Sequence, residues 1–89
     1  MVASTTVVIG SAQGLHARPA SLLTQSVAKS GAKVLLRAGD GAEANASSLL
    51  SVLTLGAKQG DSVEVLVDGE DEDILLDQLC ELLARDHDA

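Results

Sequence analysis

The chain has no phenylalanine, tyrosine or tryptophan among its 89 residues. Its core must therefore consist of Val, Ile, Leu and Ala, and its function cannot rest on base stacking or an aromatic cage. The single cysteine, Cys80, excludes an internal disulfide and a cysteine-rich metal site. Because Cys80 lies in an apolar-patterned segment, we interpret it as a small, partly packed side chain and not as a reactive thiol.

Two kinds of hydrophobic segment are also absent. Residues 1–5 lack the basic start and the apolar run of a signal peptide, and no apolar stretch approaches the length that spans a membrane. We therefore expect a soluble cytoplasmic protein with no membrane insertion. The length suits a single domain over residues 1–89 without repeats or linkers, and we expect it to be a monomer.

Basic residues are scarce in the second part of the chain. The net charge is −7, and residues 61–89 hold eleven acids but only one base, Arg85, whereas the first 60 residues hold five bases and two acids. This balance makes nucleic-acid binding a poor hypothesis. The acidic part could attract basic partners, although a solvated helix face is the favoured interpretation.

The apolar pattern predicts seven elements in the order β-α-β-β-α-β-α. Strands are expected over residues 5–9, 33–37, 42–44 and 62–67, and the first helix over 17–29. A short second helix follows the candidate caps Asn45, Ser47 and Ser48 and stops at Gly56. Acids at 70–73 suit the first turn of a third helix. Helices that cover one face of a small, mostly antiparallel sheet give a two-layer α+β domain.

The expected core follows from the same periodicity. It comprises Ala20, Leu23 and Val27 on the first helix, Val63, Val65 and Val67 on the last strand, and Leu75, Leu79, Leu82 and Leu83 on the third helix. The short second helix is apolar nearly all round, with Val52 and Leu55 on one side and Leu49, Leu50 and Leu53 fanning out beside them. These three leucines are either an exposed patch or part of the core.

One stretch combines a histidine with an anion-binding pattern: Gly14-Leu15-His16-Ala17-Arg18-Pro19-Ala20. Pro19 suits a first helical turn, where its missing N–H has no helical partner. The N–H groups after His16 are then unpaired, and they join the helix dipole and the Arg18 guanidinium in forming an anion site around the imidazole. The pattern indicates phosphoryl transfer onto His16, with a weak cap and a solvated arginine as the alternative. The other histidine, His87, lies in a tail expected to fray and is interpreted as a bystander.

At these residues the chain resembles the HPr family, the histidine-containing phosphocarriers of the bacterial phosphoenolpyruvate-dependent sugar phosphotransferase system. Residues 14–20 resemble the family's active-site motif, residues 45–56 resemble its short-helix segment, and the likeness covers nearly the whole chain. The resemblance implies an open-faced sandwich with helices on one face of a four-stranded antiparallel sheet of order 1-4-2-3. It also implies that Nδ1 of His16 accepts phosphate from enzyme I and donates it to IIA domains of sugar permeases.

Further residues take their expected roles from the same resemblance. Arg18 and the N–H groups of Ala17 and Arg18 would hold the phosphoryl oxygens. Partners would dock on one surface, at positions matched by Ala17, Ser21, Leu49, Leu50 and Leu53. No cofactor or metal is implied, and the protein would be a carrier and not an enzyme.

Ser48 matches the serine that an HPr kinase/phosphorylase modifies in many family members. A phosphate there would place negative charge beside the apolar patch and hinder enzyme I. The preceding residue is Ser47, where such members usually carry lysine, so a simple N-cap is the favoured alternative.

Other functions remain open at this point. One is the nitrogen-related branch of the family, and another is a regulatory phosphocarrier that acts on transcriptional or kinase partners. A small ligand-binding domain without phosphate chemistry is a third. A free-standing enzyme is the weakest, since the sequence shows no second catalytic acid–base pair, P-loop or metal cluster.

Overall fold

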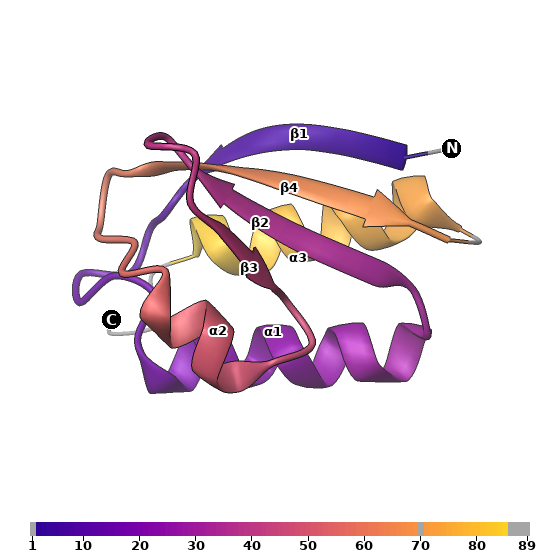
Figure 1. Ribbon diagram of the computed structural model, residues 1–89, viewed down its shortest axis with the longest axis horizontal. Helices are drawn as coiled ribbons and strands as arrows, with labels where there is room; N and C mark the ends of the chain where they lie inside the picture. The colour runs from indigo at the N-terminus through magenta and orange to yellow at the C-terminus, as the bar shows by residue number, and fades with distance from the viewer. Residues whose placement is uncertain (1, 70, 86–89) are drawn as a thin grey trace.

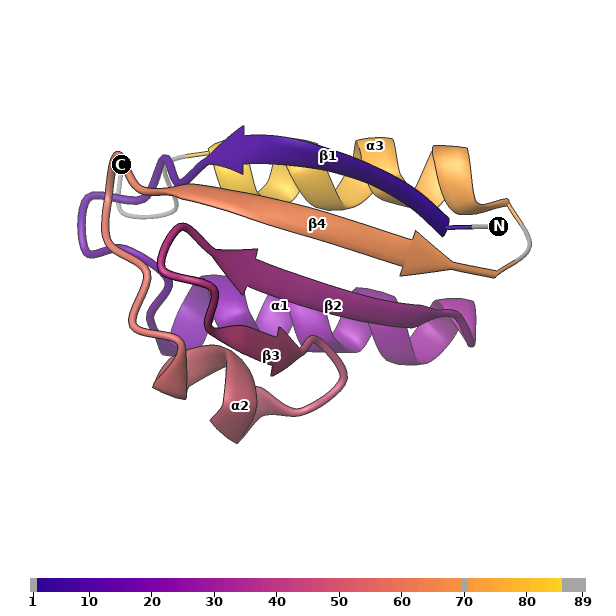
Figure 2. The same ribbon diagram turned by 45° about the horizontal axis from the view of Figure 1, so that its top comes forward.

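A four-stranded antiparallel sheet forms one layer of the computed structural model, which describes residues 2–69 and 71–85. Its strands are β1 (Val2–Val8), β2 (Lys33–Ala38), β3 (Glu43–Asn45) and β4 (Ser62–Asp68), in the order β1-β4-β2-β3. The helices are α1 (Ala17–Ser30), α2 (Leu49–Thr54) and α3 (Glu72–Ala84). Figures 1 and 2 show α1 and α3 on the same face of the sheet, with α2 beside α1 and β3. The predicted element order, sheet order and two-layer α+β class are confirmed.

The strand boundaries differ from the prediction where pairing extends a strand. β1 begins at Val2 and not at Thr5, because β4 is long enough to pair Val2 with its last residue, Asp68. Ile9 was expected to end this strand and lies just beyond it, yet it stays buried, and its N–H donates to the Asp61 carbonyl at 3.0 Å. β3 is shifted by one residue, since Ala42 belongs to the preceding turn and its carbonyl accepts from the Ala38 N–H.

The core lies between the sheet and the two long helices, and its period-2 and helical patterns were read correctly from the sequence. Val63, Val65 and Val67 of β4 are fully buried, as are Ala20 and Leu23 of α1; Val27, also of α1, is 1% exposed. These side chains belong to one continuous cluster of buried hydrophobic residues. Burial of this kind is the main favourable contribution to folding in a chain without aromatic residues.

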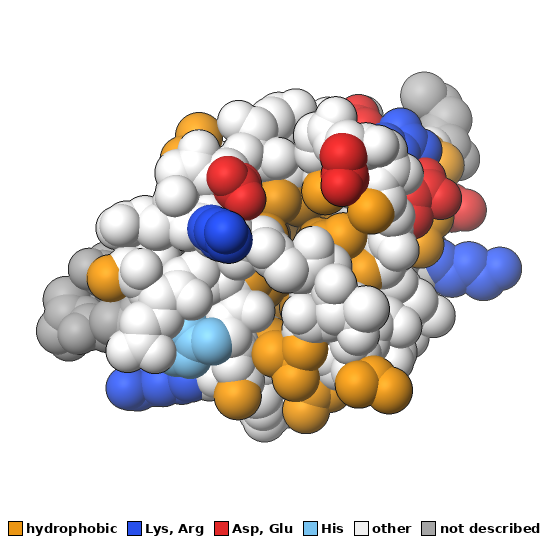
Figure 3. Space-filling model, turned by 60° about the vertical axis from the view of Figure 1, so that its left-hand side comes forward, with side chains coloured by type: hydrophobic (Ala, Val, Ile, Leu, Met, Phe, Trp, Pro, Cys, Tyr) orange, Lys and Arg blue, Asp and Glu red, His pale blue; other side chains and the backbone are white. Residues whose placement is uncertain are grey.

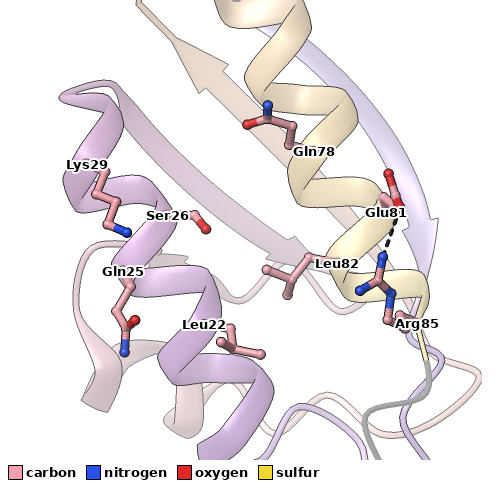
Figure 4. Close-up of a pocket in the computed structure, with 8 residues that line it drawn as sticks. All are labelled: Leu22, Gln25, Ser26, Lys29, Gln78, Glu81, Leu82 and Arg85. Carbon is pink, nitrogen blue, oxygen red and sulfur yellow. Dashed lines mark hydrogen bonds and ion pairs between the residues drawn. The ribbon is translucent and has the colours of Figure 1, made fainter.

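The stripe of α3 was predicted with one omission, the buried Leu76. Leu75, Leu79 and Leu83 are buried as expected, and Leu82 is half-buried and packs against the core. Leu82 also lines a groove of about 420 Å³ between α1 and α3, opposite Leu22. Figure 4 shows these two leucines pointing toward each other, with the Glu81–Arg85 ion pair at the rim.

The helix ends agree with the expected signals. α1 ends at Ser30, and its C-cap residue, Gly31, has φ +71°. α3 has Glu72 and Asp73 in its first turn, where the helix dipole favours acids, and Asp71 as its N-cap residue. Glu70, expected among the acids of the third helix's first turn, and His87, interpreted as a bystander, lie outside the described residues.

Candidate functional site

His16 is the N-cap residue of α1, and a tight loop delivers it there. Its backbone is extended (φ −90°, ψ −171°), and its carbonyl accepts the first helical hydrogen bond, from the Ala20 N–H at 3.0 Å. Just before it, Gly14 has φ +72° and the buried Leu15 donates its N–H to the Ala57 carbonyl at 2.9 Å. The loop is therefore anchored on both sides of His16: by the segment at Ala57 and by the helix itself.

The first turn of α1 holds two backbone donors that have no partner among the described residues. Within residues 2–69 and 71–85, neither the Ala17 N–H nor the Arg18 N–H forms a hydrogen bond, and Pro19 has no N–H to offer. The His16 side chain forms no cap hydrogen bond with them. Unpaired N–H groups and the positive end of the dipole favour an anion at the N-terminus of this 14-residue helix. The backbone at the start of α1 therefore offers two N–H donors, and the phosphate site itself stays a prediction.

The side chains around these donors differ in exposure. His16 is half-buried, and its Nε2 atom is among the buried atoms. Figure 3 shows the exposed part of the histidine in pale blue. Arg18 is exposed and forms no ion pair within the described part of the chain. Its guanidinium is therefore available to swing toward an anion held at the helix start.

The leucines of α2 are an exposed patch and not core. Leu49, Leu50 and Leu53 are 42%, 75% and 36% exposed, whereas Val52 on the other side is fully buried. We call these three leucines the α2 patch. α2 packs on α1, which carries the exposed Ala17 and the half-buried Ser21. Figure 3 shows hydrophobic side chains gathered beside the histidine on this face.

Ser48 is the N-cap residue of α2. Its hydroxyl accepts a hydrogen bond from the Ser51 N–H at 3.3 Å. The other two candidate caps form a separate turn, in which Asn45 Oδ1 accepts from the Ser47 N–H at 3.0 Å and from the Ser47 hydroxyl at 2.7 Å. Of the three residues proposed from the sequence, Ser48 is thus the one that caps the helix.

Residues 57 and 58, to which the sequence assigned no role, contact the loop that carries His16. We call residues 57–61 the 57–61 turn. A Cβ built on Gly14 would lie 2.5 Å from the Ala57 carbonyl oxygen and 2.8 Å from Lys58 Cα, so the two backbones touch. Only a fold-level argument could have revealed this, because the contact joins positions more than 40 residues apart.

Other chemistry has little support in the described residues. No group of three or more His, Cys, Asp or Glu side chains there is arranged to hold a metal ion. The thiol of Cys80 is half-buried, and burial raises its pKa, with a further contribution from the negative charge of Asp77. A raised pKa lowers the thiolate fraction at neutral pH, which agrees with a packing role. No described helix has the length and hydrophobicity to cross a bilayer.

Comparison with known proteins assigns the family. Residues 3–85 match the family model PTS-HPr, described as the PTS HPr component phosphorylation site. The phosphocarrier protein HPr of Streptomyces coelicolor is 39% identical over 84 residues, which cover 94% of this chain and 90% of that protein. The phosphocarrier protein NPr of Escherichia coli is 38% identical over 73 residues, covering 82% and 81%. The crystal structure of HPr from Bacillus anthracis aligns with a TM-score of 0.86 at 26% identity, covering 92% of this chain and 96% of that one.

The fold and these matches define a phosphocarrier of the phosphotransferase system. More particularly, the chain belongs to the HPr family, as the motif at residues 14–20 suggested.

Proposed function

We propose that the protein is a cytoplasmic carrier that accepts a phosphoryl group on His16 from phosphorylated enzyme I and donates it to IIA domains of sugar permeases. The observation that carries the proposal is the pair of N–H groups, of Ala17 and Arg18, that have no partner among residues 2–69 and 71–85 and lie at the helix start that His16 caps. Phosphoryl transfer needs a positioned nucleophile and donors for the transferred oxygens, and both are combined here.

The proposed reaction uses the lone pair of Nδ1. A neutral imidazole attacks phosphorus, the bond to the donor breaks, and the phosphoryl group stays on His16 until an acceptor takes it. The burial of Nε2 favours Nδ1 as the reactive nitrogen, because an incoming donor needs an accessible atom. The Arg18 guanidinium and the two N–H groups would then hold the phosphoryl oxygens.

Docking would use the α2 patch together with Ala17 and Ser21 of α1. Exposed leucines with polar surroundings are typical of protein interaction sites. A small apolar patch suits a shuttle, since a weak, transient complex allows each partner to leave after transfer.

A second candidate is the nitrogen-related branch, which the match to NPr supports, although the match to HPr covers more of the chain. A regulatory carrier that acts on transcriptional or kinase partners would use the same site. We further propose that Ser48 is an acceptor for an HPr kinase/phosphorylase, because its hydroxyl lies at a helix N-terminus next to the α2 patch.

The test is intact mass after mixing the protein with enzyme I and phosphoenolpyruvate. We expect one acid-labile phosphoryl group on the wild type and on His87→Ala, and none on His16→Ala, with all three proteins folded. Phosphate retained by His16→Ala would disprove the assigned residue. No phosphate on any of them with an active enzyme I, but transfer from the nitrogen-branch donor, would favour the second candidate.

A further inference from the structure

We infer that Lys58 is a second cation of the phosphoryl-transfer site, reaching the phosphoryl group from the 57–61 turn, whereas Arg18 would reach it from α1. The inference rests on the proposed function of His16. It concerns a residue outside both motifs that identified the site.

The first support is the contact between Lys58 and the loop that carries His16. Lys58 Cα lies against Gly14 so closely that a Cβ on Gly14 would be 2.8 Å away from it, and Gly14 is only two residues before His16. A lysine side chain has a flexible four-carbon stem and carries a compact charge at its end. From this position the ammonium is within reach of an anion bound at the start of α1.

The second support is that the backbone of Lys58 is fixed. Its N–H donates to the Asp61 carboxylate at 2.9 Å, and its carbonyl accepts from the Asp61 N–H at 3.0 Å. The 57–61 turn is also tied to the chain before Gly14, since Gly60 N–H donates to the Ile9 carbonyl at 2.9 Å and Gln59 Nε2 donates to the Gly10 carbonyl at 3.2 Å. The base of the side chain is thus held in place relative to His16.

The third support is that the charge of Lys58 is not used elsewhere. Arg37 is engaged by Glu43 and Glu64, and Arg85 by Glu81. The exposed Lys58 ammonium forms no ion pair or hydrogen bond with any residue in 2–69 or 71–85. Figure 3 shows Lys or Arg side chains on two sides of the histidine in that view, which fits an anion approached by two cations.

The chemistry gives this cation a specific task. During transfer the negative charge is spread over the three oxygens of the phosphoryl group, and two N–H groups and one guanidinium leave room for a further donor. A lysine with three N–H donors can follow the group as it moves between donor and acceptor. We therefore expect Lys58 to raise the transfer rate and to have little effect on folding.

A small phosphoryl donor separates this role from partner docking. Phosphoramidate carries no protein surface: Nδ1 of neutral His16 attacks its phosphorus, the P–N bond breaks, and the nitrogen, already protonated at neutral pH, leaves as ammonia. We would measure the rate of phosphohistidine formation in wild type, Lys58→Met, Lys58→Arg and Lys33→Met. Lys33→Met is the matched control. Lys33 is an exposed lysine at the start of β2, which follows the C-terminal end of α1, whereas His16 caps the N-terminal end of that helix.

We expect Lys58→Met to react more slowly with phosphoramidate, by about tenfold or more, as the loss of one charge-assisted hydrogen bond predicts. Lys58→Arg should recover most of the rate, and Lys33→Met should match the wild type. A wild-type rate for Lys58→Met, or an equal loss for Lys33→Met, would overturn the inference.

The same variants distinguish this inference from the proposed function. If Lys58→Met is slow with enzyme I but normal with phosphoramidate, Lys58 contacts the partner protein and the inference is wrong while the carrier function stands. If the wild type reacts with phosphoramidate at His16 but accepts nothing from any phosphorylated donor protein, the carrier function fails independently of Lys58.

Discussion

Gly14 lies against the backbone of Lys58 more closely than any residue with a side chain would allow. A Cβ on Gly14 would be 2.5 Å from the Ala57 carbonyl oxygen and 2.8 Å from Lys58 Cα, and the residue has φ +72°. The loop before His16 and the 57–61 turn therefore meet at a contact for which glycine is required twice, once by its dihedral angle and once by space.

We expect Gly14→Ala to lose more than about 2 kcal/mol of unfolding free energy, because a positive φ and a collision with fixed backbone atoms add together. Gly31→Ala is the matched control: its φ is +71°, but nothing lies within 4 Å of the added Cβ. That variant should lose only about 1 kcal/mol. Urea unfolding of both proteins gives the comparison, and equal losses would show that the Gly14 contact relaxes freely.

Arg18→Ala should slow phosphorylation by enzyme I about tenfold and leave the unfolding midpoint unchanged, since Arg18 is exposed and supplies a charge-assisted donor. Arg37→Ala removes the same charge from the open face of the sheet and should transfer at the wild-type rate. Initial rates with phosphorylated enzyme I provide the test. An unchanged rate for Arg18→Ala would remove this residue from the site.

Leu50→Asp should weaken the binding of enzyme I about tenfold or more without a loss of thermal stability, because Leu50 is 75% exposed and is the most exposed residue of the α2 patch. Ile74→Asp offers a control with the same chemistry, since Ile74 is 61% exposed on α3, away from the patch. Calorimetric titration and a melting curve are needed for each variant. A large drop in melting temperature for Leu50→Asp would mean that Leu50 supports the core.

Much of the fold follows from local sequence signals, and the errors occur where partners far apart in the chain decide the outcome. The alternation of Val63, Val65 and Val67 predicted their burial, because a strand that covers a core has only one inner face. The start of β1 was set too late, since its length depends on the length of β4. Leu82 fits the stripe by its spacing and packs against the core, but it stays half-buried because it lines the groove between α1 and α3.

The candidate site divides in the same way. His16, Arg18 and Pro19 are close in sequence, so the helix start that they form could be read directly. The exposure of the α2 leucines depends on which side of α2 packs against α1. The sequence did not decide this, so it left both an exposed patch and a core position possible. Lys58 was missed entirely, because no local pattern joins it to Gly14.

Ser48 allows its capping and regulatory roles to be measured separately. Ser48→Ala should cost about 1 kcal/mol of unfolding free energy, because its hydroxyl accepts from the Ser51 N–H, and should leave phosphorylation of His16 unchanged. Ser48→Asp should keep the cap and the stability, since a carboxylate also caps a helix, but should slow transfer from enzyme I by placing a charge beside Leu49. Unfolding curves and transfer rates of both variants are compared with those of Ser47→Asp, which adds the same charge one residue away from the cap. If Ser48→Asp transfers as fast as the wild type, a phosphate at this position has no means of regulating the carrier.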